Sequence, residues 1–135
     1  NEAISHMIKK IHFTPDKRPE NTNIRINNIS NGKIQVFNKN EWKTKMKKTF
    51  IKDLILKYGE KLIELYDDFI EENKIKKDYY SNFHEFSSKI GNCYSLEEVD
   101  DDDKDINFMK EQEQLVDCML IDCCKKHKDY LNNLK

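Results

Sequence analysis

The sequence predicts an α+β domain: an N-terminal helix and a small three-stranded antiparallel meander packed against three or four helices. Apolar and polar residues alternate between residues 24 and 37, which is the period of a half-buried strand. Apolar residues recur at helical spacing near the N-terminus and again after residue 48. With 3 Gly, 2 Pro and 36% charged residues, the chain is too poor in turns for a β-sandwich and too polar for a membrane protein.

The first predicted element is a short amphipathic helix from Glu2 to about Ile11. Its apolar stripe consists of Ala3, Ile4, Met7, Ile8 and Ile11. Pro15 and Pro19 end this helix and begin a polar loop that continues to Asn23. We expect the loop to be ordered, because two prolines reduce the entropy lost on ordering and Asn side chains can bond backbone groups.

Three strands follow the loop. Ile24 and Ile26 mark the first, and Asn31-Gly32 is a favoured tight-turn dipeptide that predicts a hairpin into a second strand over residues 33–37. Residues 38–40 form the next turn, and residues 41–44 form a third strand that carries Trp42, the single Trp of the chain. A sheet this small needs helices to cover its apolar face.

Helical periodicity then predicts three further segments. One runs from residue 48 to residue 70 with a break or kink at Gly59, one ends at Gly91, and the last runs from Ile106 or Lys110 to Leu131. The acidic stretch 97–105 between the last two is expected to be a mobile loop. Most of the core is expected from Ile24, Ile26, Ile34, Val36, Trp42, Ile51, Leu54, Ile55, Leu62 and Leu65.

Charge is segregated along what we interpret as one domain over residues 1–135. Residues 1–57, the helix and sheet part, carry 13 Lys and Arg against 5 acidic residues, a net charge of +8. Residues 58–135, the acidic helical part, carry 11 against 20, a net charge of −9. A basic part of this kind can contact phosphate, and an acidic part can dock on a basic partner; solvated helix faces produce the same asymmetry.

The cysteines indicate thiols in a reducing intracellular compartment rather than disulfides, since three of the four cluster near the C-terminus. Cys123 and His127, one helical turn apart, are candidate ligands for one metal ion. No further ligand is well spaced, so buried thiols that fill a helix face are the simpler interpretation, and no cofactor is expected. No residue is predicted to be catalytic, because no nucleophile lies beside a base and the glycines are isolated.

A basic run surrounds Trp42 and is a candidate nucleic-acid surface. Its members are Lys39, Trp42, Lys43, Lys45, Lys47 and Lys48. Lysines beside an aromatic residue on a strand can bind phosphates while the ring stacks on a base. The alternative is that Trp42 belongs to the core and the lysines only solubilise the sheet.

The segment from Ile8 to Tyr66 resembles a domain of giant DNA viruses of the mimivirus type and their relatives. The resemblance rests on a His-Phe-Asn-Pro opening, here with Thr14 in place of Asn, and on a Pro-Glu-Asn-x-Asn-Ile loop before a Trp-bearing strand. The matching loop residues are His12, Pro19, Glu20, Asn21 and Asn23. In that family the domain is C-terminal and often follows a two-Cys-two-His zinc finger. The resemblance gives no zinc ligands here, because the finger itself is absent from this chain.

The resemblance implies an auxiliary viral domain, located in the host cytoplasm or the viral factory, that accompanies a DNA-binding region elsewhere in a longer protein. Together with the lack of a catalytic constellation, it indicates a protein-interaction or oligomerisation module. Nucleic-acid binding is the alternative. His12 and Asn21 also resemble the His and Asn of HNH nucleases, a more distant alternative, because residues 49–73 contain no second metal-coordinating His.

Two further expectations concern partners and stability. The helices have broader apolar faces than one small sheet can cover, so a homodimer is expected; viral or host proteins and nucleic acid are further partners, and a membrane is not. His12 is expected to hydrogen-bond the loop at Asn21 and Asn23. On that basis Asn21→Ala should lower the free energy of unfolding by about 1 to 2 kcal/mol.

Overall fold

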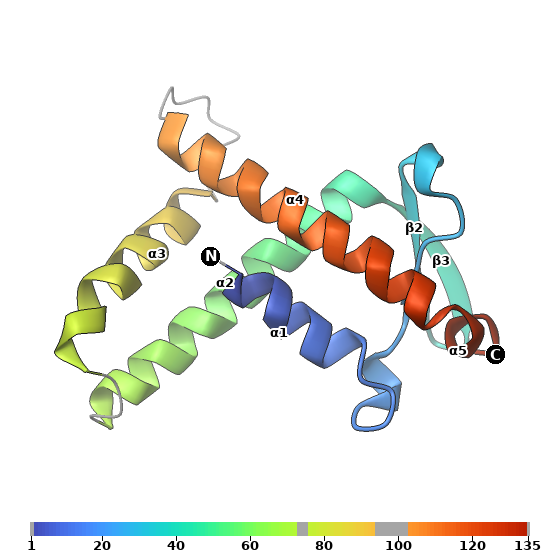
Figure 1. The fold of residues 1–135 in the computed structure, drawn as a ribbon, viewed down its shortest axis with the longest axis horizontal. Coiled ribbons are helices and arrows are strands. Elements are labelled where there is room, and N and C mark those ends of the chain that lie inside the picture. Colours follow the sequence, from blue (N-terminus) through green and yellow to red (C-terminus); the bar gives the residue numbers. More distant parts are fainter. Residues whose placement is uncertain (1, 73–75, 94–102, 135) are drawn as a thin grey trace.

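The computed structural model describes residues 2–72, 76–93 and 103–134. It is an α+β fold, as the sequence predicts (Figure 1). In chain order its elements, with η for 3₁₀ helices, are α1 (Ala3–His12), η1 (Pro19–Asn21), β1 (Ile24–Arg25), η2 (Ile29–Asn31), β2 (Lys33–Asn38), β3 (Glu41–Met46), α2 (Lys47–Glu71), η3 (Lys77–Tyr79), α3 (Tyr80–Cys93), α4 (Asp103–Lys126) and α5 (Lys128–Asn132).

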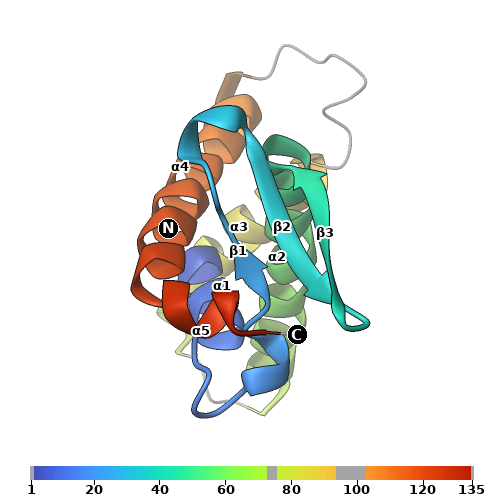
Figure 2. The ribbon, with the colours of Figure 1, turned by 90° about the vertical axis from the view of Figure 1, so that its right-hand side faces the viewer.

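The helices form one layer behind the sheet. Helix α1 packs against both α2 and α4, and α3 packs against the same two long helices at the end away from the sheet (Figure 1). Figure 2 shows the sheet from its open side, with α1, α2 and α3 behind it and α5 and the end of α4 beside β1. One face of the sheet is therefore covered and the other is uncovered.

The sheet is the predicted meander, with strand order β1-β2-β3 and both pairs antiparallel. The tight two-residue turn lies at Lys39–Asn40, where both residues have positive φ (52° and 65°), as a type I′ hairpin requires. Strands β1 and β2 form the predicted antiparallel hairpin, but the tight turn predicted at Asn31-Gly32 is wrong: residues 26–32 form a longer connection that contains η2. The Asn28 side chain accepts a hydrogen bond from the Ser30 N–H, which stabilises that helical turn instead.

Helix boundaries differ from the prediction in two places. Helix α2 continues through Gly59 without a break. The glycine lies where α3 approaches α2, since a Cβ at this position would be 2.7 Å from the Cδ1 of Ile90. The last predicted helix ends at Lys126, and α5 follows it. Of the predicted acidic loop, residues 97–102 lie outside the described residues, whereas residues 103–105 belong to α4.

The core joins residues from both the basic and the acidic part of the sequence in one cluster. Its fully buried members include Ile4, Ile8, Ile24, Ile34, Ile55, Ile90, Val116 and Leu120. Of the expected core, Ile24, Ile34, Ile51, Leu54 and Ile55 are buried, and Ile26 and Leu62 pack at its margin. The expectation is wrong for Leu65, which is 42% exposed, and Val36 and Trp42 are only half-buried.

No helix in the described part of the chain combines the length and the apolar character needed to cross a lipid bilayer.

Candidate functional site

The predicted loop motif converges on His12, the last residue of α1. Its Nδ1 atom lies 2.8 Å from the backbone oxygen of Asn21 and 3.2 Å from Oδ1 of Asn23. Its Nε2 atom lies 2.7 Å from the hydroxyl of Tyr58 on α2. Since a carbonyl oxygen only accepts, Nδ1 carries the proton and Nε2 accepts from the Tyr58 hydroxyl. Both ring nitrogens of His12 are thus engaged within the chain.

Asn23 links this histidine to the sheet. Its side-chain Nδ2 donates to the backbone oxygen of Phe37 at 3.2 Å, and its own backbone oxygen accepts from the Phe37 N–H at 2.8 Å. The Asn21 side chain makes no hydrogen bond to the other described residues; only its backbone oxygen serves His12. The two asparagines therefore lie at His12 as expected, but through different atoms.

Further hydrogen bonds to backbone oxygens stabilise the rest of the loop. The Thr14 hydroxyl donates to the Lys10 backbone oxygen at 2.6 Å, and the Thr14 backbone oxygen accepts from the N–H groups of Lys17 and Arg18. Pro19 and Glu20 are exposed in η1. This loop connects α1, α2 and the sheet, which is a structural role.

Burial is the main reason why the pKa of His12 lies below its ordinary value of 6.5. Its hydrogen bonds to Asn21 and Asn23 oppose this effect, and the positive charges of Lys57 and Lys61 add to it. The unfolded chain therefore binds a proton more readily than the folded chain. The contribution of His12 to the free energy of unfolding is therefore complete above pH 6.5, and it decreases as the pH falls below that value.

We predict that His12→Gln reduces the loss of stability below pH 6.5, because the replacement cannot take up a proton. A single group of this kind changes the free energy of unfolding by at most about 1.4 kcal/mol per pH unit. Urea unfolding of parent and variant at a series of pH values measures the difference. The exposed His6 provides the matched control, His6→Gln. Identical pH profiles for the parent and His12→Gln would contradict the prediction.

The basic run around Trp42 does not form one uniform surface. Lys39, Lys43, Lys45 and Lys48 are exposed, whereas Lys47 is mostly buried and forms an ion pair with Asp117 at 3.2 Å. The Nζ atom of Lys43 lies 3.7 Å from Oε1 of Glu41, so these two side chains form an ion pair.

Trp42 lies on the open face of the sheet, where its ring is already in contact. The guanidinium of Arg25 lies 3.9 Å from the ring centroid, and the Phe37 ring packs beside it at 5.2 Å. Arg25 also donates to Oε1 of Gln35 at 2.8 Å, which holds it in place. This arrangement leaves little of the Trp42 ring for stacking on a nucleic-acid base.

Both members of the candidate metal pair pack against other parts of the chain. Cys123 is buried in α4, where burial raises the pKa of its thiol, and the His127 ring stacks on Phe13 with centroids 6.2 Å apart. Burial raises the pKa of Cys124 to about 12, and its thiol donates to the Ile24 backbone oxygen. Within the described ranges, His, Cys, Asp and Glu side chains do not come together in a group of three or more that could hold a metal ion.

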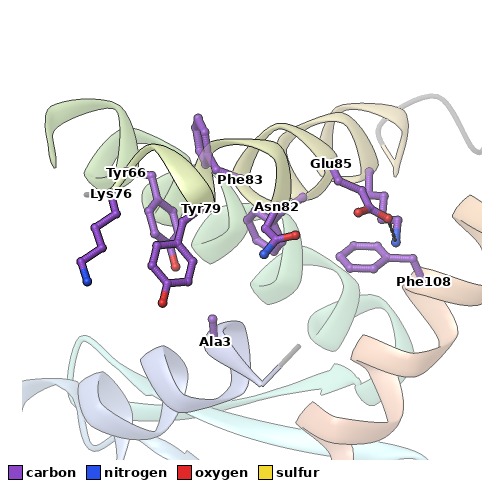
Figure 3. A pocket seen from close by; sticks show the side chains of 10 residues that line it. Ala3, Tyr66, Lys76, Tyr79, Asn82, Phe83, Glu85 and Phe108 are labelled. Atoms are coloured by element: carbon purple, nitrogen blue, oxygen red, sulfur yellow. Dashed lines mark ion pairs between the residues drawn. The ribbon is translucent and has the colours of Figure 1, made fainter. Parts of the chain in front are cut away.

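An aromatic groove of about 840 Å³ lies between α3, the C-terminal half of α2 and the start of α1 (Figure 3). Its lining residues are Ala3, Tyr66, Lys76, Tyr79, Asn82, Phe83, Glu85, Phe86, Lys89 and Phe108. The Tyr66 and Phe83 rings pack at 5.3 Å and the Phe86 and Phe108 rings at 6.2 Å. The sequence predicts the helix that ends at Gly91, but it does not predict the groove beside that helix.

Charged side chains border the groove at both ends. At one end Lys89 forms an ion pair with Glu85 at 3.1 Å and lies over the Phe108 ring, 5.5 Å from its centroid. Lys76 lies at the other end, beside Tyr79 (Figure 3). An apolar floor between charged ends is suited to a peptide or helix that carries apolar side chains.

Comparisons of the chain with protein-family models, with curated proteins and with solved structures found no match.

Proposed function

We propose that this domain is a protein-interaction module that self-associates through the aromatic groove and the adjoining exposed stripe of α2, formed by Leu65 and Phe69. The observation that carries the proposal is the clustering of exposed apolar side chains. Leu65 is 42% exposed, Phe69 39% and Tyr79 58%, and all three belong to α2 and η3, which border the groove. Exposed apolar side chains on the elements that border an apolar groove favour an interaction site there.

The charges around the groove favour a second copy as the occupant. The C-terminal half of α2 carries Glu64, Asp67 and Asp68, whereas the groove is bordered by Lys76 and Lys89. In a two-fold arrangement, each surface patch contacts its own equivalent. The acidic half of α2 in one copy can then face Lys76 of the other, since Lys89 is already paired with Glu85, while the aromatic side chains pack between them.

We predict a mass of twice 16.2 kDa at high micromolar concentration, and a monomeric mass for Phe69→Asp. The carboxylate introduced at position 69 would have to be buried without a partner when two copies associate. Multi-angle light scattering over a concentration series measures both. The matched control is Ile29→Asp, since Ile29 is similarly exposed (49%) but lies beside the sheet. A monomeric parent, or a variant that dimerises like the parent, would contradict the proposal.

The resemblance of residues 8–66 to giant-virus domains adds a context to this proposal. In that context the module accompanies a DNA-binding region elsewhere in a longer protein, and its partners include other viral or host proteins. Direct contact with nucleic acid is the second candidate. The exposure of Lys39, Lys43, Lys45 and Lys48 favours it, through phosphate contacts rather than base stacking.

A further inference from the structure

Strand β3 is an edge of the sheet, and its outer side has no neighbouring strand among the residues that the structure describes (Figure 2). The type I′ turn at Lys39–Asn40 makes Asn38 and Glu41 a hydrogen-bonded pair, so that hydrogen-bonded and non-hydrogen-bonded pairs alternate from there. Phe37 and Trp42 are then a non-hydrogen-bonded pair. The hydrogen bond of the Phe37 N–H agrees with this alternation. This N–H donates to the backbone oxygen of Asn23, on the side of β2 that faces away from β3.

The backbone groups of Trp42 and Thr44 consequently point away from β2, to the free edge. Neither residue's N–H or C=O bonds any other element in the described part of the chain. The Lys43 and Lys45 backbone groups instead face β2, opposite Val36 and Ile34. The edge therefore presents unpaired donors and acceptors to which an extended peptide can add as a fourth strand.

The side chains of β3 define what such a strand must carry. Lys43 and Lys45 share the face of Ile34 and are exposed at the edge, while Trp42, Thr44 and Met46 alternate with them on the open face. A strand that pairs with the free edge places its residues opposite Lys43 and Lys45 in non-hydrogen-bonded pairs, in which side chains lie closest. Acidic residues fit these two positions, and apolar residues fit those opposite Trp42 and Met46.

A second β3 strand does not meet these requirements. Antiparallel pairing of two copies centred on Thr44 places Lys43 of one copy opposite Lys45 of the other. Like charges directly opposite each other are destabilising in a sheet. The lysines thus oppose edge-to-edge self-association and favour a partner of opposite charge.

We infer that the free edge of β3 binds an extended peptide segment of another protein with the pattern apolar-acidic-x-acidic-apolar. This surface is separate from the aromatic groove, and its function does not depend on self-association. The pattern reads the same in both directions, so it permits antiparallel or parallel addition. Backbone hydrogen bonds at Trp42 and Thr44 supply affinity, and the two lysines supply selectivity.

A synthetic peptide of sequence Ser-Gly-Val-Glu-Thr-Glu-Val-Gly-Ser provides the test. Trp42 is the single Trp of the chain and lies on the strand itself, so its fluorescence reports binding directly. We expect saturable binding by this peptide. Binding should be at least about tenfold weaker for a peptide of the same composition with adjacent Glu residues, which places the carboxylates on opposite faces.

Thr44→Pro is the decisive variant. Proline removes the edge-facing N–H but no hydrogen bond to β2, so the sheet retains its pairing while peptide binding weakens at least about tenfold. Thr44→Ala is the matched control, because both replacements lose the hydroxyl that accepts from Gln35 Nε2 at 3.2 Å. We expect Thr44→Ala to bind like the parent. The double variant Lys43→Glu with Lys45→Glu should reject the acidic peptide and accept its Lys counterpart.

Three outcomes would overturn the inference: no binding to the parent protein, equal binding to Thr44→Pro, or tight binding of single-stranded DNA with none of the peptide. If Thr44→Pro does not fold, as judged by circular dichroism, amide hydrogen exchange of the parent decides. Peptide must then slow exchange at Trp42 and Thr44, and unchanged exchange at both amides overturns the inference.

Discussion

Ile8→Ala is expected to lower the free energy of unfolding by about 3 to 4 kcal/mol, a typical cost for removing a fully buried aliphatic side chain. Ile8 is 0% exposed, and it lies in α1, which packs against α2 and α4 together. The cavity therefore opens where three helices meet, and rigid helices cannot close it easily. A domain of this size has a total stability of about 5 to 15 kcal/mol, so a large part would be lost.

Urea unfolding followed by circular dichroism measures this loss, and Ile29→Ala is the matched control. The same atoms are removed, but Ile29 is 49% exposed in η2, and the expected change is below about 0.5 kcal/mol. Equal destabilisation by the two variants would show that α1 does not form part of the core. An unchanged midpoint for Ile8→Ala would show the same.

Local patterns predicted the elements because each depends on neighbours in the sequence. The stripe of Ile4 and Ile8 predicts α1, and the alternation around Ile34 predicts β2; both side chains are buried. Leu65 continues the same kind of stripe along α2 and yet is exposed. Helix α2 has 25 residues and is about 37 Å long, which is more than its neighbours cover. How much of a helix its neighbours cover depends on tertiary packing, and the spacing of apolar residues along the helix does not predict it.

The candidate site shows the same limit. Sequence reasoning placed His12 at Asn21 and Asn23, because these residues are close in the chain. It did not find Tyr58, which is 46 positions away and meets the other ring nitrogen of His12 only when α1 packs on α2. It also did not find the aromatic groove, since the apolar face of a helix such as α3 has the same sequence pattern whether a groove or a packed neighbour lies against it.

The open face of the sheet illustrates a third kind of error. Trp42 was expected either in the core or free to stack on a base, and it is instead half-buried on the open face. Arg25 and Phe37 occupy the space around its ring, and their approach depends on the diagonal geometry of three paired strands. The pairing register of β1 with β2 decides this, and a strand of two residues has too little pattern to predict its register.

His12→Ala is expected to lower the free energy of unfolding by about 3 kcal/mol. The replacement removes the acceptor for the Tyr58 hydroxyl and the donor to Asn21 and Asn23, and each buried polar group left unpaired costs about 1 to 3 kcal/mol. Tyr58 is only 2% exposed, so water cannot readily replace the imidazole there. Asn21→Ala, by contrast, should cost less than about 0.5 kcal/mol, because its backbone oxygen remains. This replaces the larger effect expected from sequence alone.

A double-mutant cycle separates the hydrogen bond from the packing of the two rings. Tyr58→Phe keeps the aromatic ring, whose centroid lies 5.8 Å from that of His12, and removes only the hydroxyl. If the two side chains interact as the 2.7 Å contact indicates, the effects of His12→Ala and Tyr58→Phe are not additive. We expect a coupling energy of about 1 kcal/mol from urea unfolding of the parent, both single variants and the double variant. Additive effects would mean that the hydrogen bond does not contribute to stability, and that His12 holds the loop through Asn21 and Asn23 alone.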